Sequence, residues 1–496
     1  MNGFFGFKKT IFGILVLWYS GLMINRHIFR AYDIRGKAHA QIDADACRKI
    51  GQAFGTVLWR RYKKDHPTVV VGRDARTHSP ELEAAVIEGL MKAGCHVLKI
   101  GQTPSPLNYF TICNRELDGG IQVTASHNPK EDNGLKLQTR DAEAFSGEDL
   151  QDLRRQIEAG DFLESQGTQE EIDAVSPYKT LLTEKFKNAG RGLTIVVDGG
   201  NGVAGPVNCA ILRSAGAEVI ELFTEPDGTF PNHAADPSKH ETLKDLQAKV
   251  KETGADLGLA FDGDGDRLGL VDEKGSIVTA DQAILLLAQD HLSRHPGKPV
   301  VFTVSNSGVL ETEITKWGGT PIMCKVGHSY VEHAMREAGA SLGGEQSGHF
   351  FCGEDYYGFD DALVAALRIL SIISTPNPNP NPNPNPNPKT PQRLSGLLQN
   401  FPTVYQSPEL RPHCPDDAKG KVIESITEHF SKTYPVNTLD GVRIDFGDDA
   451  WAGIRQSNTS PCISVCMEAR SPEKLKQVRK EVIAQLKTHA ELKIEN

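Results

Sequence analysis

A pattern of apolar strand, polar turn and amphipathic helix recurs three times along the chain. The copies span residues 68–101, 194–223 and 299–327, and each ends in a second apolar run. The helical part of each copy closes on Ala-Gly or Gly-Gly, as helices commonly do. An internal repeat of strand, helix and strand predicts βαβ units with largely parallel, right-handed connections.

Each copy continues into a further predicted strand that ends in a polar loop. The loop sequences are TASHNP after the first copy, DGDGDR after the second and GEQSGH after the third. Equivalent positions of a repeat lie at equivalent strand ends, and open α/β sheets bind ligands at the carboxyl ends of their strands. We therefore expect the three loops to face one cleft and to form a composite site.

A chain of 496 residues is too long for a single core, so we expect three or four domains. We predict three similar α/β domains with mixed or parallel sheets and a C-terminal α+β domain, arranged around a central cleft. Six Asn-Pro pairs that end at Pro388 predict an extended linker, because proline fixes φ and removes a backbone donor. The predicted divisions are an N-terminal extension at 1–26, domain I at 27–172, domain II at 173–276, domain III at 277–374, the Asn-Pro linker at 375–392 and domain IV at 393–496. In domain IV the segments VRIDF and PCISVCMEA are predicted strands, followed by a terminal helix.

Composition narrows the class of protein. The net charge is −10 with no basic tract, which argues against nucleic acid as a partner. Nine cysteines without a C-x-x-C pair favour a reducing cytoplasm over a disulfide framework or a zinc site. Lys8 and Lys9 precede an apolar run that resembles a signal peptide, but the run is too short to span a membrane and lacks a cleavage site. We interpret residues 1–22 as an extension outside the fold, with no membrane partner, and keep a signal or anchor as the alternative.

The DGDGDR loop predicts a metal site. Asp262, Asp264 and Asp266 alternate with glycines, so the backbone can bend and direct three carboxylates toward one hard cation such as Mg²⁺. An acidic surface turn is the alternative. An EF-hand would place its last ligand at Glu273, but Arg267 occupies the position that requires glycine, so we reject it.

Two further motifs leave the chemistry open. Ser126 in TASHNP is either a turn residue or a nucleophile, and no Gly-x-Ser-x-Gly elbow surrounds it. Together with a Mg²⁺ loop, such a serine favours reversible phosphoryl transfer. Gly200, Gly202 and Gly205 form a G-x-G-x-x-G pattern with Glu221 downstream, which supports a rival function as a nucleotide-cofactor oxidoreductase. The same glycines equally suit a local turn.

Taken together, TASHNP, DGDGDR, GEQSGH and the later RQSNTSP resemble the α-D-phosphohexomutase family, in its phosphomannomutase/phosphoglucomutase branch. The resemblance runs from about residue 28 to the C-terminus, interrupted by the Asn-Pro segment. It implies an isomerase that interconverts the 1- and 6-phosphates of mannose and glucose through a phosphoserine enzyme and a hexose 1,6-bisphosphate. Ser126 would carry the phosphate and, with the three aspartates, hold one Mg²⁺.

The resemblance also implies roles for other residues. Arg35, Lys136 and His349 would act in catalysis, with Lys136 and His349 as candidates for general acid and base. The residues implied to bind substrate are Tyr32, Arg267, Lys325, His328, Glu345 and Ser347, together with Arg455, Ser457, Asn458 and Thr459 for the phosphate that does not react.

One departure concerns the start of domain III, where this branch commonly has a lysine and this chain has Ser305. Phosphoglucosamine mutase and an inactive sugar-phosphate binding protein are the remaining alternatives. The AYDIRG segment and the Ser457-Asn458-Thr459 sequence favour the neutral hexoses over glucosamine.

Overall fold

The computed structural model describes residues 24–374, 392–457 and 460–493. The predicted extension at 1–22, residues 375–391 of the predicted linker, and Asn458 and Thr459 lie outside them. The chain divides into two compact units. The first contains the described residues up to Tyr178 and the segment 227–231, and the second contains the rest.

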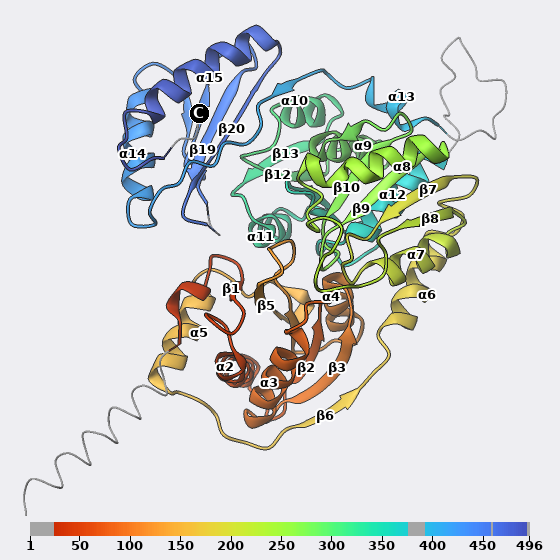
Figure 1. Ribbon diagram of the computed structural model, residues 1–496, viewed down its shortest axis with the longest axis vertical. Helices are drawn as coiled ribbons and strands as arrows, with labels where there is room; N and C mark the ends of the chain where they lie inside the picture. Colours follow the sequence, from red (N-terminus) through yellow and green to blue (C-terminus); the bar gives the residue numbers. More distant parts are fainter. Residues whose placement is uncertain (1–23, 375–391, 458–459, 494–496) are drawn as a thin grey trace, which may run out of the picture. The chain divides into compact units, whose positions relative to one another are not determined.

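The first unit is built on a six-stranded sheet in the order β1-β5-β4-β2-β3-β6 (Figure 1). Its strands are β1 (Ile34–Lys37), β2 (Thr68–Arg73), β3 (His96–Gln102), β4 (Gly119–Val123), β5 (Asp132–Thr139) and β6 (Thr168–Glu171). Its helices are η1 (Arg26–Ile28), α2 (Ala44–Tyr62), α3 (Ser79–Lys92), α4 (Ser105–Asn114), η2 (Arg140–Ala142) and α5 (Glu148–Ala159), and α6 (Val175–Lys185) leads into the second unit.

The core of the first unit shows why these segments pack as they do. Helices α2, α3 and α5 bury one apolar stripe each against β2, β4 and β5, in a core that also includes Ile24. Asp43 caps α2, because its side chain accepts a hydrogen bond from the backbone N–H of Ala46. A side chain at Gly89 of α3 would lie 2.0 Å from the backbone oxygen of Arg48, so the two helices approach as closely as backbones allow.

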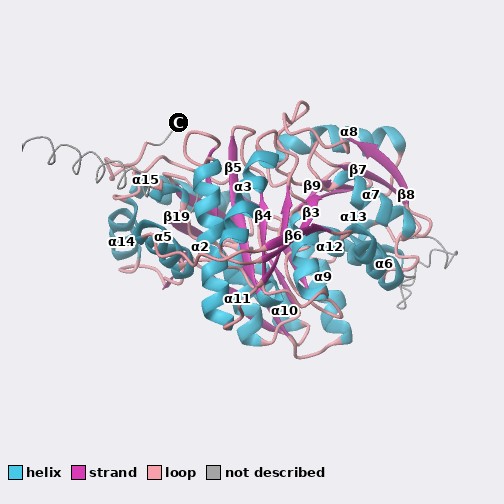
Figure 2. Cartoon of the chain, turned by 90° about the horizontal axis from the view of Figure 1, so that it is seen from below, coloured by secondary structure: helices cyan, strands magenta, loops and turns pink. Residues whose placement is uncertain are grey.

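The second unit contains two smaller sheets that repeat the plan of the first. One has the order β11-β10-β9-β7-β8 and the other β13-β12-β14-β15. Their strands are β7 (Thr194–Asp198), β8 (Glu218–Leu222), β9 (Leu257–Phe261), β10 (Leu268–Asp272) and β11 (Ile277–Val278), then β12 (Pro299–Thr303), β13 (Thr320–Cys324), β14 (Leu342–Gly344) and β15 (Phe350–Cys352). Their helices are α7 (Gly205–Ser214), η3 (His240–Leu243), α8 (Lys244–Thr253), α9 (Ala280–Arg294), α10 (Val309–Lys316), α11 (His328–Ala338) and α12 (Ala362–Ser374), and Figure 2 shows strands and helices in separate colours.

The predicted repeat is confirmed strand by strand. In each copy the opening strand (β2, β7 or β12) pairs in parallel with two neighbours, which are the next two strands of that copy. A fourth strand (β5, β10 or β15) then returns antiparallel to the third. The three predicted polar loops are the three hairpin loops that join the third and fourth strands. The sheets are therefore mixed, and the loops occupy equivalent positions.

The C-terminal part of the second unit is the predicted α+β domain. An antiparallel sheet in the order β16-β20-β19-β18-β17 packs against α14 and α15 around one apolar core (Figure 1). Its elements are α13 (Leu394–Leu398), β16 (Tyr405–Gln406), α14 (Lys419–Phe430), β17 (Val436–Asn437), β18 (Val442–Asp445), β19 (Trp451–Gln456), β20 (Ile463–Ala469) and α15 (Pro472–Leu486). The sequence pattern predicted β18, β20 and α15 but missed β19.

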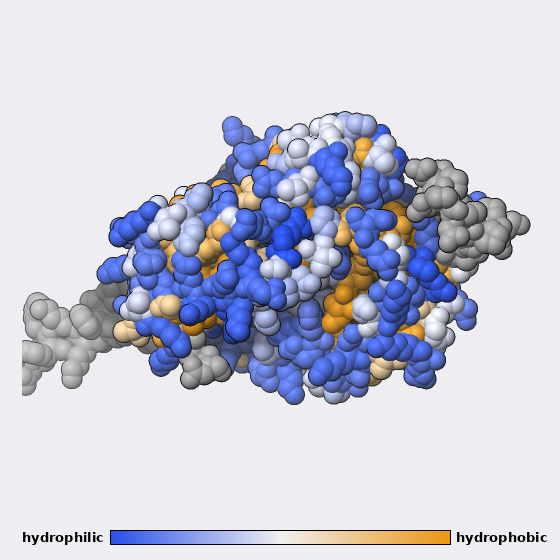
Figure 3. Space-filling model, turned by 90° about the horizontal axis from the view of Figure 1, so that it is seen from above, coloured by the Kyte–Doolittle hydropathy of each residue, from blue (hydrophilic) through white to orange (hydrophobic). Residues whose placement is uncertain are grey.

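The surface is mainly hydrophilic on the face drawn in Figure 3, where apolar residues form separate small areas. Across the described residues, the exposed large hydrophobic side chains are Tyr357, Tyr405 and Leu439. Within the same part of the chain, no helix combines the length and the apolar character needed to cross a membrane.

Candidate active site

Ser126 lies in the hairpin loop between β4 and β5, in the first unit. Its side chain is buried, and its φ of +51° places a non-glycine residue in the left-handed region. The backbone N–H of Ser126 donates to Thr124 Oγ1 at 2.8 Å. Its Oγ lies 3.1 Å from His127 Nδ1. A hydroxyl in contact with an imidazole can exchange its proton, so the loop presents a serine suited to nucleophilic chemistry.

Of the residues predicted in the first unit, Arg35 contacts this loop directly. Arg35, on β1, donates from Nη1 to Asn128 Oδ1 at 2.9 Å and to the backbone oxygen of Ala125 at 3.3 Å, and pairs with Asp33 at 2.6 Å. Lys136 is buried on β5, and Tyr32 lies two positions before the first residue of β1. Arg35 is thus anchored on both sides of Ser126.

The three aspartates lie in the hairpin loop between β9 and β10, in the second unit. All three are completely buried, and one carboxylate oxygen from each lies within 4.8 Å of the others. Asp262 Oδ1 accepts hydrogen bonds from the backbone N–H groups of Gly265, Asp266 and Arg267 at 2.9 to 3.2 Å, and Gly265 has a φ of +79°. Three buried carboxylates repel one another unless a cation lies among them, and an all-oxygen donor set fits Mg²⁺.

The sugar-recognition loop predicted from GEQSGH lies beside this acidic loop. The backbone N–H of Leu268 donates to the backbone oxygen of Gly348 at 3.0 Å. Arg267 Nε donates to His349 Nε2 at 3.0 Å. Since Nε2 accepts, Nδ1 carries the proton and donates to Asp360 Oδ2 at 2.7 Å. The structure therefore brings the predicted residues of domains II and III together in one polar cluster.

Two carboxylates hold the segment that precedes α11. The backbone N–H of Gly327 donates to Glu345 Oε1 at 2.7 Å, and Ser347 Oγ donates to Glu345 Oε2 at 3.4 Å. The neighbouring N–H of Val326 donates to Asp440 Oδ2, from domain IV, at 3.0 Å. His328 begins α11 and stacks on His349 with ring centroids 5.6 Å apart. Lys325 is exposed and lies 5.9 Å from the Tyr330 ring centroid.

The predicted phosphate loop follows β19. Arg455 is on that strand, and Ser457 is buried at its end. Two basic residues without a predicted role lie against the loop. Arg411 Nη2 donates to Ser457 Oγ at 3.2 Å, and Lys419 Nζ donates to the backbone oxygens of Ser457 and Ser460 at 3.0 and 2.6 Å. The loop thus lies in a cationic environment, which suits a phosphate.

Ser305, where a lysine was expected from the resemblance, is a buried residue in the turn after β12. Arg443 of domain IV donates to the flanking backbone oxygens of Val304 and Asn306 at 2.5 and 2.9 Å. Burial lowers the pKa of Arg443 to about 10. The turn is therefore held by an arginine from domain IV.

The structure argues against two alternatives, an EF-hand at the acidic loop and a nucleotide-cofactor site with Glu221 as ribose ligand. Strands β9 and β10 flank the acidic loop, and Glu273 accepts hydrogen bonds from Ser395 at 2.5 and 3.2 Å, so the rejection of an EF-hand is sound. Glu221, the predicted ribose ligand of a cofactor site, instead accepts from Arg213 and Thr224, both at 2.5 Å. Gly202 packs against the acidic loop, because a side chain there would lie 2.8 Å from the backbone oxygen of Gly263.

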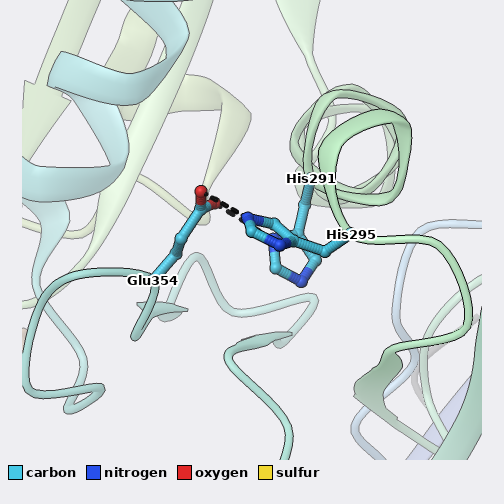
Figure 4. A group of neighbouring side chains, drawn as sticks. All are labelled: His291, His295 and Glu354. Atoms are coloured by element: carbon cyan, nitrogen blue, oxygen red, sulfur yellow. Dashed lines mark hydrogen bonds and ion pairs between the residues drawn. The ribbon is translucent and has the colours of Figure 1, made fainter.

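Another polar cluster lies at the C-terminal end of α9. His291 and His295 contact the carboxylate of Glu354 at 3.1 and 2.7 Å (Figure 4). Arg294 and Arg368 pair with the same carboxylate. Burial, and then the nearby His295 and both arginines, lower the pKa of His291 to about 4. The arginines already neutralise Glu354 and repel a cation, so this cluster is better explained as a structural junction.

Comparisons with known proteins agree with this geometry. Four models for phosphoglucomutase/phosphomannomutase match, three for the alpha/beta/alpha domains I, II and III at residues 26–164, 175–275 and 279–404, and one for the C-terminal domain at 409–485. The chain belongs to the phosphoglucomutase/phosphomannomutase family. The predicted resemblance is confirmed.

Members of this family align with nearly the whole chain. A phosphomannomutase/phosphoglucomutase of Pseudomonas syringae is 38% identical over 461 residues, which cover 93% of this chain and 95% of that protein. A phosphoglucomutase of Neisseria gonorrhoeae is 36% identical over 474 residues, which cover 95% of this chain and 98% of that protein. A crystal structure of a phosphoglucomutase/phosphomannomutase family protein from Burkholderia thailandensis superimposes with a TM-score of 0.84 at 37% identity, covering 94% of this chain and 98% of that one.

The residues at these loops that escaped the sequence analysis include His127, Asp360, Arg411 and Lys419. His127 stood inside a recognised motif but had no assigned role. The other three lie outside every motif, and only the folded chain brings them to a loop.

Proposed function

We propose that the protein is a phosphohexomutase that interconverts the 1- and 6-phosphates of mannose and glucose. One observation carries the proposal: a buried serine held in a left-handed conformation and a buried loop of three carboxylates occur in one chain, on equivalent hairpins of a repeat. Phosphoryl transfer depends mainly on positioning and on neutralising charge, and these two loops supply both.

Ser126 carries the phosphoryl group in this proposal. Ser126 Oγ loses its proton when it accepts phosphate from a hexose 1,6-bisphosphate and regains it when it gives phosphate away, and His127 at 3.1 Å is placed to take and return that proton. The residues that would hold Mg²⁺ are Asp262, Asp264 and Asp266. When bound, Mg²⁺ neutralises charge on the transferred phosphoryl oxygens.

The sugar is bound by the loops of domains III and IV. Glu345 and Ser347 offer an acceptor and a hydroxyl to sugar hydroxyls, while Arg455 and Ser457, with Asn458 and Thr459, hold the phosphate that does not react. Lys136 and His349 are the candidates to exchange a proton with the reacting sugar oxygen. The sugar must turn around between the two half-reactions, so its remote phosphate needs a clamp separate from Ser126.

The neutral hexoses are the proposed substrates, and the cytoplasm is the proposed location. A hydroxyl exchanged for an amine in a polar site changes kcat/KM by about 10 to 1000-fold. Purified protein should therefore convert mannose 1-phosphate and glucose 1-phosphate with comparable kcat/KM and glucosamine 1-phosphate clearly less well. Preference for glucosamine 1-phosphate would contradict the choice of substrate but not the mechanism.

The activity itself is tested by assaying the same two hexose 1-phosphates with and without Mg²⁺, in the presence of a trace of hexose 1,6-bisphosphate. We expect turnover that requires Mg²⁺ and is stimulated by the bisphosphate. Absence of turnover with every hexose phosphate under these conditions would refute the proposal.

A further inference from the structure

Arg76 lies in the turn between β2 and α3, and no role was predicted for it. It is the largest side chain that is fully buried among the described residues. A buried guanidinium is costly unless each of its five N–H groups finds an acceptor. In this structure all five do.

Four of these donors bind the phosphoserine loop. Nη2 donates to the backbone oxygens of Ser126 at 2.9 Å and Asn128 at 2.7 Å. Nη1 donates to the backbone oxygens of Pro129 at 2.6 Å and Asp132 at 3.0 Å. One rigid, planar group therefore fixes four carbonyls of a seven-residue segment that begins at the reacting serine.

Asp74 holds Arg76 and contacts the same loop from its other end. Its Oδ2 accepts from Arg76 Nε at 3.0 Å and from Thr124 Oγ1 at 2.8 Å. Thr124 Oγ1 in turn accepts from the backbone N–H of Ser126. Both the N–H and the C=O of Ser126 are thus tied to the Asp74–Arg76 pair, one through Thr124 and one directly.

This arrangement explains how Ser126 keeps its conformation. A left-handed φ at a non-glycine residue costs about 1 kcal/mol or more and persists where surrounding contacts over-determine it. The turn of the second repeat supports its own hairpin loop in a similar way, because the N–H of Val203 donates to the backbone oxygen of Gly263 at 3.1 Å.

We propose that Arg76, oriented by Asp74, is a positioning residue for phosphoryl transfer. It fixes the backbone of the phosphoserine loop so that Ser126 Oγ keeps one position through both half-reactions. In this proposal Arg76 acts on the loop through its hydrogen bonds to backbone oxygens and does not itself bind the sugar phosphate. The inference rests on the proposed function of Ser126.

The test compares Arg76→Lys and Arg76→Met with a matched control, Arg73→Met. Arg73 is the last residue of β2, three positions before Arg76. Its side chain pairs with Glu83 at 3.2 Å and donates to Gln102 Oε1 at 3.1 Å and to the backbone oxygen of Asp74 at 3.4 Å, and these three partners lie outside the segment 126–132 that Arg76 binds. For each folded variant we would measure the melting temperature, kcat and KM for glucose 1-phosphate, and the rate at which hexose 1,6-bisphosphate phosphorylates the protein.

Arg76→Lys should lower kcat and the phosphorylation rate together by about 10²-fold, as expected when a reacting atom is misplaced by about 1 Å. KM should stay close to that of the wild type. Arg76→Met should lower both rates further, and Arg73→Met should leave them unchanged. If Arg76→Met does not fold, Arg76→Lys alone decides the question.

A purely structural role would lower the melting temperature of the Arg76 variants but leave kcat per folded molecule equal to that of Arg73→Met, and this result would overturn the inference. Failure of the proposed function is a separate outcome, because the wild type would then show neither turnover nor phosphorylation.

Discussion

Gly202→Ala is predicted to weaken metal binding without touching a carboxylate. A methyl group at this position would lie 2.8 Å from the backbone oxygen of Gly263 and 2.9 Å from that of Asp262. Ordinary contact begins near 3.4 Å, so the acidic loop must move by about 0.5 Å. Ligand positions in a metal site tolerate deviations of about 0.2 Å, so this displacement disturbs the site. Overpacking of this kind costs about 1–3 kcal/mol of stability.

The assay is the dependence of mutase activity on Mg²⁺ concentration. We expect the half-saturating concentration to rise about tenfold, which corresponds to about 1.4 kcal/mol of binding free energy. Gly420→Ala is the control, because a side chain at that position of α14 meets nothing within 4 Å. A folded Gly202→Ala protein with the Mg²⁺ dependence of the wild type would refute the reasoning. Dinucleotide binding by the wild type that Gly202→Ala abolishes would support the oxidoreductase alternative instead.

Three further predictions follow from other contacts. Asp264→Asn keeps the size of the side chain but removes a buried charge, so Mg²⁺ affinity by calorimetry and mutase activity should both fall steeply; unchanged affinity would exclude Asp264 as a ligand. Asp440→Ala removes the acceptor of the Val326 N–H. The loss of this hydrogen bond should raise KM for hexose phosphates about 3 to 10-fold. An unaltered KM would argue against coupling between domain IV and the segment before α11. His291 has its pKa lowered from 6.5 to about 4, so the unfolded state binds more protons between these values. The contribution of His291 to stability therefore falls by about 1.6 kcal/mol as the pH decreases from 6.5 to 5. In thermal unfolding at both pH values, His291→Gln should lose less stability than the wild type, and an equal loss would contradict the low pKa.

The sequence predicted the repeat and its loops because these features are local. The opening strands β2, β7 and β12 are continuous apolar runs bounded by turns, and a strand buried on both faces has that pattern. β19 was missed because WAGIRQ mixes a glycine and an arginine into a short strand. Its pairing with β18 and β20 stabilises it, and strand pairing is not visible in the sequence of one segment.

The candidate site was predicted where one motif contains several candidate ligands, as in the three aspartates. Contacts between distant segments were not predicted. Asp360 meets His349 only because β15 and the segment before α12 fold together. Arg76 is 50 residues from Ser126 in the chain, and only the folded structure shows that its guanidinium donates to the backbone of the Ser126 loop.

The central claim is that Ser126 carries the phosphate, and intact-mass measurement tests it most directly. Wild-type protein and Ser126→Ala would each be incubated with Mg²⁺ and hexose 1,6-bisphosphate. The intact mass and the mutase activity would then be measured on the same preparation. We predict one phosphate adduct on the wild type and none on Ser126→Ala, with turnover reduced by several orders of magnitude and the melting temperature almost unchanged. A phosphate adduct on Ser126→Ala, or near-normal turnover by that variant, would contradict the account.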